Sequence, residues 1–276
     1  MRDASPLRYP GGKWRISPLF ERIIQLNRMK GCDYFEPYAG GASLALSLLF
    51  ANYVSEIHLN DLDPGVHAFW HVALKRNKDL RELIESTVVT REEWIRQKTI
   101  FKQGLEAGLL ALGFATFFLN RTNHSGILNG GMIGGKAQDG IWKLDARFNK
   151  SELLKRILRI NSYKSRIHIS KLDAIDFLRE KAPHPNSLVY LDPPYYNAGA
   201  RLYLNAYMPD DHAAVRNSVK RLDAPWIVSY DDVSEIRKLY KPVRSRRVRL
   251  LHTAQYLKLG EEVLFFSSQL KIPNFH

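Results

Sequence analysis

One stretch of the sequence combines a carboxylate, two prolines and two aromatic rings: Leu191-Asp192-Pro193-Pro194-Tyr195-Tyr196. It follows Ser187 to Leu191, a short apolar segment that is typical of a buried parallel strand. Each proline restricts its own backbone and that of the residue before it, so Asp192 and the Pro193 carbonyl are expected to present two acceptors toward one point. Tyr195 adds a flat face for stacking. The combination suits a planar heterocycle with an exocyclic amino group.

An isolated Asp-Pro-Pro is explained equally well by a proline turn whose aspartate caps the next helix. A second junction favours the chemical interpretation. There a strand ends at Glu36 or Pro37, small residues follow, and an apolar helix begins at Ser43. Small residues let the backbone pass close to a ligand at a helix start. The spacing differs from the GxGxxG dinucleotide fingerprint, and the sequence has no GxxxxGK[ST] phosphate loop.

Two further segments add polar groups. Asp61 follows a predicted strand, Glu56 to Asn60, and is placed to accept hydrogen bonds from ribose hydroxyls. By itself Asp61 is better explained as a helix cap before Val66, but the glycine turn in front of it favours the ribose. Near the N-terminus, Tyr9 and Lys13 flank a Pro-Gly-Gly turn, which a featureless loop does not explain.

Together these segments resemble the Dam-like DNA adenine methyltransferases, which use S-adenosylmethionine and methylate adenine at its exocyclic N6. The resemblance spans nearly the whole chain in the family's order. DPPY alone also occurs in cytosine-N4 and RNA methyltransferases, whereas the ordered set is specific. The set is YPGGK from Tyr9, FEPYAGGAS from Phe35, NDLDP from Asn60, FFLNRTNHSG from Phe117, DPPY from Asp192, and a closing strand pair around Gly260 to Val263.

The resemblance implies a role for each matching residue. Asp61 would hold the ribose, and Asp173, after the strand Ile167 to Ser170, would face the cofactor's adenine. The cofactor set is Tyr9, Lys13, Glu36, Pro37, Ala39, Gly40, Gly41, Ala42, Asp61, Asp173 and Asp192. The catalytic set is Asp192, Pro193, Pro194 and Tyr195, with Tyr196 in support.

Composition agrees with a nucleic-acid partner. Lys and Arg outnumber Asp and Glu by 41 to 28, which gives a net charge of +13 and a pI near 9.7. A binder of phosphate backbones needs such an excess, although charge runs are usually only solvated faces. The single cysteine, Cys32, argues against disulfide scaffolds and cysteine zinc sites. His67 and His71 lack the intervening glutamate of a metalloprotease, and no metal is expected.

The expected fold is α/β: a Rossmann-like methyltransferase fold with a mixed, mainly parallel seven-stranded sheet and an inserted, mostly helical target-recognition domain. Residues 1–64 and 167–276 would form the catalytic domain, and residues 65–166 the insert. Within the insert, Lys75 to Lys102 and Leu105 to Leu119 have apolar residues at helical spacing, and Gly126 to Gly140 is glycine-rich. The charged and polar residues beside this glycine-rich loop suit DNA contacts. The DNA-binding set is Arg121, Asn123, Lys143, Arg147 and Tyr196. A cofactor-side lid is the alternative.

The sequence therefore predicts a site-specific DNA methyltransferase that acts on a flipped adenine in double-stranded DNA with S-adenosyl-L-methionine. The alternatives are an RNA adenine or cytosine-N4 methyltransferase and a catalytically silent DNA-binding relative. We expect a cytoplasmic protein, since no apolar run has transmembrane length and no signal-peptide region is present. A monomer or weak homodimer is expected, and a cognate restriction enzyme is a possible partner in restriction-modification.

Overall fold

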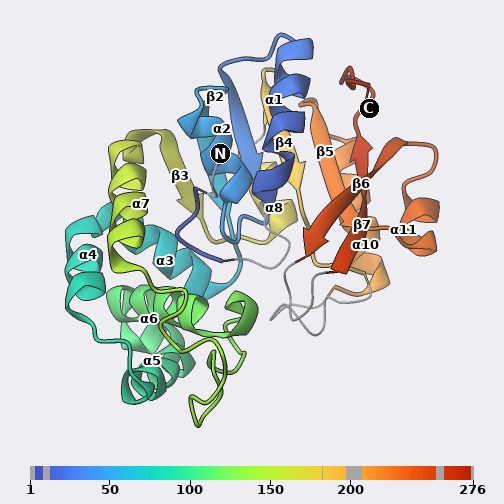
Figure 1. The fold of residues 1–276 in the computed structure, drawn as a ribbon. Coiled ribbons are helices and arrows are strands. Elements are labelled where there is room, and N and C mark those ends of the chain that lie inside the picture. Colours follow the sequence, from blue (N-terminus) through green and yellow to red (C-terminus); the bar gives the residue numbers. More distant parts are fainter. Residues whose placement is uncertain (1–3, 9–12, 182, 197–206, 253–257, 275–276) are drawn as a thin grey trace.

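In the computed structural model, which describes residues 4–8, 13–181, 183–196, 207–252 and 258–274, seven strands form one sheet (Figure 1). Their order across the sheet is β3-β2-β1-β4-β5-β7-β6. The strands are β1 Cys32–Glu36, β2 Val54–Asn60, β3 Ile167–Ser170, β4 Ser187–Leu191, β5 Trp226–Asp231, β6 Arg244–His252 and β7 Lys258–Phe266. The first five in spatial order pair in parallel, whereas β7 pairs antiparallel with both β5 and β6. The predicted mixed, mainly parallel sheet of a Rossmann-like methyltransferase fold is confirmed.

Alternating side chains along the strands feed two hydrophobic clusters, one on each face of the sheet. Tyr34 of β1 and Tyr190 of β4 belong to one cluster, and their neighbours Phe35 and Val189 to the other. The first face is covered by α1 Ser17–Leu26 and α2 Ser43–Phe50. The second is covered by α8 Ala174–Lys181, α10 Pro209–Lys220 and α11 Ser234–Leu239. The sheet is therefore the middle layer of three.

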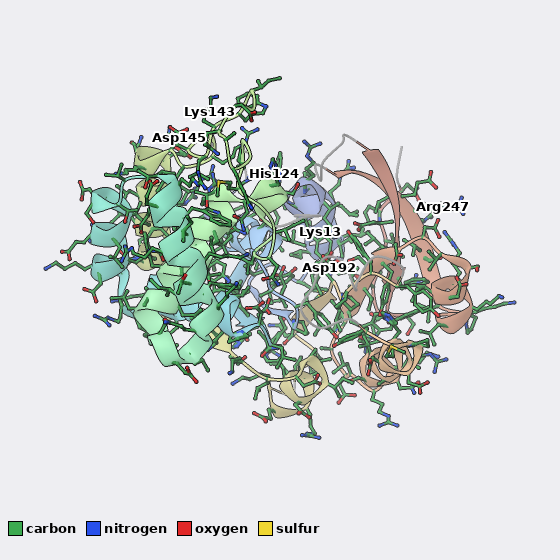
Figure 2. All side chains as sticks on the ribbon, turned by 90° about the horizontal axis from the view of Figure 1, so that it is seen from below. Lys13, His124, Lys143, Asp145, Asp192 and Arg247 are labelled. Atoms are coloured by element: carbon green, nitrogen blue, oxygen red, sulfur yellow. The ribbon has the colours of Figure 1, made fainter. Side chains whose placement is uncertain are left out.

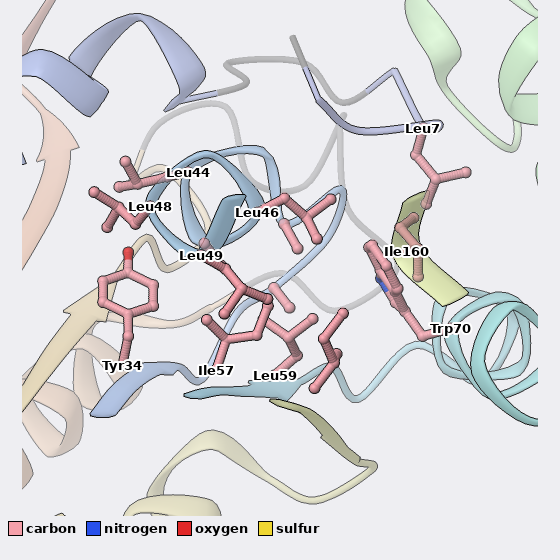
Figure 3. Close-up of a cluster of buried hydrophobic side chains, with 14 of the residues drawn as sticks. Leu7, Tyr34, Leu44, Leu46, Leu48, Leu49, Ile57, Leu59, Trp70 and Ile160 are labelled. Atoms are coloured by element: carbon pink, nitrogen blue, oxygen red, sulfur yellow. The ribbon is translucent and has the colours of Figure 1, made fainter. Parts of the chain in front are cut away.

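Helix α2 lies at the centre of the first face. All eight of its residues are buried, which explains why the sequence SLALSLLF has no polar stripe. In Figure 3 its leucines, among them Leu44 and Leu49, lie over Tyr34 of β1 and Ile57 of β2. This packing fixes the start of α2, and with it the glycine turn, against the ends of β1 and β2.

A helical block lies beside the β3 side of the sheet (Figure 1). It contains α3 Pro64–Lys75, α4 Asn77–Ser86, α5 Arg91–Gln103, α6 Leu109–Thr122 and α7 Lys150–Ser162. Trp70 and Ile160 of this block belong to the same cluster as α2 (Figure 3). Sheet and block thus share a core, and their division at residues 64 and 167 stays a prediction.

Capping residues divide the block more finely than its periodicity indicates. Two helices, α4 and α5, occupy most of the segment from Lys75 to Lys102. Helix α4 ends where Thr87 leaves the helical conformation. Thr90 then starts α5, because its side chain accepts a hydrogen bond from the Glu93 N–H at 3.1 Å. Asn149 caps α7, accepting from Glu152 N at 3.0 Å.

No helix among the described residues is long and apolar enough to cross a membrane.

Candidate active site

The parallel strands place the ends of β1, β2 and β3 at one edge of the sheet, and a buried asparagine joins them. Asn60 ends β2, and its side-chain amide donates to the carbonyls of Pro37 and Leu172, each at 3.0 Å. Its Oδ1 accepts from the Leu172 N–H at 2.9 Å. The loops after β1 and β3 are therefore held in fixed positions. Asn60 is the first residue of the NDLDP motif, and this bridging role was not predicted from the sequence.

Asp61 holds the glycine turn. Its Oδ2 accepts from the Gly40 N–H at 2.8 Å, and its Oδ1 accepts from the Asp63 N–H at 3.0 Å. Trp70 donates to the Gly40 carbonyl at 2.9 Å from the other side. Gly40 and Ala42 both have left-handed backbone angles, with φ of 46° and 47°. Burial and the neighbouring Asp63 raise the pKa of Asp61 to about 7.

The alternative role for Asp61, capping the next helix, belongs to Asp63. The Asp63 carboxylate accepts from Gly65 N at 2.7 Å and Val66 N at 3.1 Å, and Asp63 is the N-cap of α3. Asp61 therefore joins the tip of β2 to the turn before α2. The helix-cap explanation for Asp61 is therefore removed, and its contact with the ribose stays a proposal.

A lysine, two carboxylates and a tyrosine meet at the end of β4. Lys13 Nζ lies 3.0 Å from Asp192 Oδ2 and 3.0 Å from Glu262 Oε1. Tyr195 OH donates to the same Glu262 oxygen at 2.7 Å, and Lys13 Nζ lies 5.6 Å from the Tyr195 ring centre. In Figure 2, Lys13 and Asp192 lie beside each other at the centre of the molecule. The network joins the N-terminal segment, the DPPY segment and β7.

Asp192 is held through both of its oxygens. Ser229 of β5 donates to Asp192 Oδ1 at 2.6 Å, and the Ser229 hydroxyl also lies 2.8 Å from Tyr190 OH. Burial raises the pKa of Asp192, with Glu262 adding to the rise, while Lys13 and Ser229 act in the opposite direction. The lysine and the serine thus favour the ionised carboxylate, which is the form that accepts hydrogen bonds.

The ammonium of Lys13 is nearly completely buried, with 5% of its side chain exposed. Burial disfavours its charge, but Asp192, Tyr195 and Glu262 outweigh burial and raise the pKa of Lys13 well above its ordinary value. Lys13 is therefore charged at neutral pH. It is the shared cation of two carboxylates, one from the DPPY segment and one from β7.

Glu36 is a buried acid that differs from Asp192 in its protonation at neutral pH. It ends β1 with 4% of its surface exposed, and Tyr34 OH donates to its Oε1 at 2.9 Å. Burial, with Asp192 adding to the effect, raises the pKa of Glu36 to about 8. At neutral pH Glu36 therefore carries a proton for most of the time and can donate a hydrogen bond.

The remaining residues of the predicted catalytic and cofactor sets differ in burial and in their contacts. Pro193 and Pro194 are buried, and their rings restrict the backbone of this segment. Asp173 is exposed and accepts from Ile175 N at 2.8 Å at the start of α8, so at least one of its oxygens caps that helix. Tyr196 packs against His212, with ring centres 5.1 Å apart, and its backbone N–H donates to Asp231 at 2.9 Å. Tyr9 lies outside the described residues.

Asn120, near the end of α6, connects the N-terminal segment to the glycine-rich loop. Its Oδ1 accepts from Arg8 N at 2.6 Å, and its Nδ2 donates to Arg8 O at 2.7 Å and Gly126 O at 3.0 Å. A Cβ at Gly126 would lie 2.2 Å from Arg8 O, and Gly126 has a φ of 78°. Only glycine fits this close approach. The backbone of Arg8 is thus held by the helical block, a contact that the sequence did not reveal.

The structure removes one residue from the predicted DNA-binding set. Asn123 is completely buried; its Oδ1 accepts from Trp94 at 2.7 Å and its Nδ2 donates to Ile127 O and Leu128 O at 2.8 and 3.0 Å. Its amide shapes the turn and is not available to DNA. An asparagine after a helix stabilises a turn as often as it contacts DNA. The residue type alone therefore could not show which of these two roles Asn123 has.

The basic members of the set lie at the surface of the helical block. Arg121 donates to the backbone carbonyl of Arg147 at 2.7 Å, and the Arg147 guanidinium lies 5.1 Å from the ring centre of Trp142. Lys143 is exposed and donates to Gln138 O at 2.6 Å. Ile141 and Trp142 are 92% and 60% exposed. A basic surface with an exposed aromatic ring is therefore present in the segment between α6 and α7.

The residues at the strand ends fit S-adenosylmethionine by their chemistry. Asp61 and Asp192 directly follow β2 and β4, and Asp173 lies in the loop after β3, at the same edge of the sheet. Carboxylates there can accept hydrogen bonds from hydroxyl and amino groups, and they favour a ligand with a positive centre. The turn through Gly40 brings backbone close to the same edge.

Replacing Asp61 with alanine should lower the affinity for S-adenosylmethionine by about 1.5 to 3 kcal/mol, roughly ten- to a hundredfold, as expected for a lost hydrogen bond to a charged group. Asp63→Ala is the matched control, because it removes the α3 cap and should lower the free energy of unfolding by about 1 kcal/mol with little change in cofactor affinity. Calorimetric titration and chemical denaturation of both variants measure the two effects. An unchanged dissociation constant for Asp61→Ala would leave Asp61 a purely structural residue.

Comparison with known proteins gives one family. A family model described as D12 class N6 adenine-specific DNA methyltransferase matches residues 9–253. No curated protein matches the sequence. Among solved structures, the rRNA methyltransferase aviRa from Streptomyces viridochromogenes is 15% identical with a TM-score of 0.42, over 93% of this chain and 85% of that chain. A conserved hypothetical protein from Streptococcus pyogenes is 9% identical with a TM-score of 0.37, over 87% of this chain and 88% of that chain.

Proposed function

Because this chain belongs to the D12 class N6 adenine-specific DNA methyltransferase family, we propose that it transfers a methyl group from S-adenosylmethionine to the N6 amino group of an adenine flipped out of duplex DNA. The observation that carries the proposal is the Asp192 carboxylate, held by Lys13 at 3.0 Å and by Ser229 at 2.6 Å at the end of β4. An acceptor held this rigidly is suited to orient an amino group.

The chemistry that the cofactor supplies is a methyl group already activated by a positively charged sulfur. The protein's part is to place the nucleophile. Asp192 and the Pro193 carbonyl accept hydrogen bonds from the N6 amino group and turn its lone pair toward the methyl carbon. As N6 bonds to that carbon, the electrons of the carbon–sulfur bond would stay on sulfur, and the Asp192 carboxylate would accept the proton that N6 gives up and pass it to water. Orientation and preorganised charge account for the rate, without a covalent enzyme intermediate.

Tyr195 stacks on the flipped base. Its hydroxyl donates to Glu262 Oε1 at 2.7 Å, so the ring has a fixed orientation beside Asp192. A base in a duplex is paired and stacked, and its amino group cannot reach this site without rotating out. Tyr196, which packs on His212, supports the DPPY segment from behind.

The segment between α6 and α7 binds the DNA. Arg121, Lys143 and Arg147 supply positive charge, and Trp142 supplies an exposed ring beside Arg147. In Figure 2, Lys143 lies on one side of the Lys13–Asp192 pair and Arg247 of β6 on the other. Duplex DNA lying across the site would therefore meet positive charge on both sides of the reacting adenine.

A substrate panel tests the proposed function. The purified protein is incubated with radiolabelled S-adenosylmethionine and with duplex DNA, single-stranded DNA or RNA of one sequence, and the products are digested to nucleosides. We expect label in N6-methyladenine from the duplex. Label mainly in N4-methylcytosine or in RNA would replace the proposal with one of the sequence-based alternatives. Cofactor binding without transfer to any substrate would indicate a silent DNA-binding relative.

The DNA-binding role of the middle segment has its own test. If Arg147 only neutralises a phosphate, Arg147→Ala should weaken binding to all sequences alike and reduce the slope of log affinity against log salt by about one. If it contacts a base edge, about 1 to 3 kcal/mol of discrimination at one position should be lost. Arg179→Ala is the control, because Arg179 lies on α8 paired with Asp176 and is 73% exposed. Equal behaviour of the two variants would favour the lid function for this segment.

A further inference from the structure

Three aromatic rings form a row across the first three strands of the sheet. Phe35 of β1 is the register partner of His58 in β2, which is the partner of His168 in β3. The Phe35 and His58 rings stack with centres 4.3 Å apart and planes 6° apart, and those of His58 and His168 with centres 4.7 Å apart and planes 18° apart. Helix α8 covers the Phe35 end of the row through Phe177. The two histidines lie toward the open edge of the sheet.

A glutamate completes a group of three metal-binding side chains. Glu56 precedes His58 by two residues and therefore projects from the same face of β2. Its Oε2 lies 2.8 Å from His168 Nε2, with 43% of the Glu56 side chain and 45% of the His168 side chain exposed. One ligand atom from each of Glu56, His58 and His168 can be chosen so that all three lie within 4.8 Å of one another.

We propose that Glu56, His58 and His168 form a binding site for a divalent transition-metal ion that bridges β2 and β3. Ligands at about 2.0 to 2.1 Å around a tetrahedral ion lie about 3.4 Å apart. The present 2.8 Å hydrogen bond between Glu56 and His168 would lengthen slightly as the ion enters between them. Because the His58 and His168 rings stack with planes 18° apart, at least one imidazole would also turn out of the stack so that both nitrogen lone pairs reach the ion. Water would complete the coordination.

Charged groups surround the His58 imidazole. Burial, together with His168, lowers the pKa of His58 to about 4. Among the nearby charged groups, Asp33 and Glu56 attract positive charge, whereas Lys181 opposes it. Asp33 also holds His184 at 3.2 Å, so that third histidine is engaged separately.

The donor set selects among metals. Two imidazole nitrogens and one carboxylate suit Zn²⁺, Ni²⁺ and Cu²⁺, whereas Mg²⁺ and Ca²⁺ prefer oxygen ligands alone. A bound ion would tie β3, the outermost strand, to β2. These are the strands whose ends lead into Asp61 and Asp173, so the site would hold that edge of the sheet together.

Zinc titration by calorimetry tests the proposal on the full-length protein. We expect one Zn²⁺ per chain, an upward shift of the unfolding temperature with added Zn²⁺, and no comparable effect of Mg²⁺. His168→Ala and Glu56→Gln should each weaken Zn²⁺ binding at least tenfold and abolish the shift. Both substitutions are at half-exposed side chains, so folding should be retained, and denaturation without metal checks this.

His184→Ala is the matched control, because His184 is 51% exposed, is paired with a carboxylate and, among the residues that the structure describes, belongs to no such group of three. It should leave Zn²⁺ binding unchanged. Co²⁺ in place of Zn²⁺ gives visible absorption whose intensity reports low coordination number, and that absorption should be lost in His168→Ala. Equal Zn²⁺ affinity in the wild-type protein and His168→Ala, or an equal loss in His184→Ala, would overturn the proposal.

Discussion

Replacing Asp192 with alanine should lower the rate of methyl transfer by about 10² to 10⁴-fold, the range found when a positioned catalytic group is removed. Cofactor affinity should stay within a few-fold, because the proposed partner of this carboxylate is the substrate amino group. The fold should survive, since Lys13 keeps Glu262 as its partner at 3.0 Å. Single-turnover methylation and calorimetric titration with S-adenosylmethionine measure the two quantities separately.

Asp176→Ala is the control for that experiment. Asp176 is an aspartate on α8, 45% exposed and paired with Arg179 at 2.8 Å, and its loss should change neither rate nor affinity. Asp192→Asn adds a finer comparison, because it keeps the side-chain shape but presents a neutral amide to Lys13 and Ser229. Transfer by Asp192→Ala at close to the wild-type rate would disprove the catalytic role of this residue.

Local sequence patterns predicted most strands and several helix starts of this fold. The segments Ser187–Leu191 and Ile167–Ser170 are strands with the predicted bounds, and α2 begins at Ser43 as expected. These elements are short and apolar, and prolines, glycines or small polar residues bound them. Such signals act over a few residues and can be recognised without knowing what packs against them. The closing strand pair was predicted around Gly260 to Val263, and it consists of β6 Arg244–His252 and β7 Lys258–Phe266.

The site was predictable only as a set of motifs. The DPPY segment, the glycine turn and Asp61 were identified singly, but not the contacts that hold them. Glu262 contacts Lys13 across 249 positions of sequence, and Asn120 contacts Arg8 across 112. Such contacts follow from β7 inserting antiparallel between β5 and β6 and from α6 packing near the N-terminal segment, and no local propensity encodes either arrangement. The histidine pair of β2 and β3 depends in the same way on strand register.

Replacing Lys13 with methionine should have the largest effect on stability. The partly buried carboxylate of Asp192 and the buried carboxylate of Glu262 would lose their common cation. Breaking a buried ion pair from one side costs about 3 to 5 kcal/mol of unfolding free energy. Lys78→Met is the matched control, because Lys78 pairs with Glu82 at 3.8 Å while 79% of its side chain is exposed. An exposed pair contributes about 0 to 1 kcal/mol. Urea denaturation at pH 8 compares the two.

The pH dependence of that loss identifies its cause. Burial raises the pKa of Asp192, and without Lys13 the rise should be larger. The folded variant would then bind a proton more tightly than the unfolded chain, so its stability falls as the pH rises from about 4 through the raised pKa. The wild-type protein keeps the contribution of Lys13 throughout this range, because the pKa of Lys13 is raised well above 10.5. The difference in unfolding free energy between the two proteins should therefore be small at pH 5 and large at pH 8. A difference that is equal at both pH values would mean that Lys13 stabilises the protein by packing, not by charge.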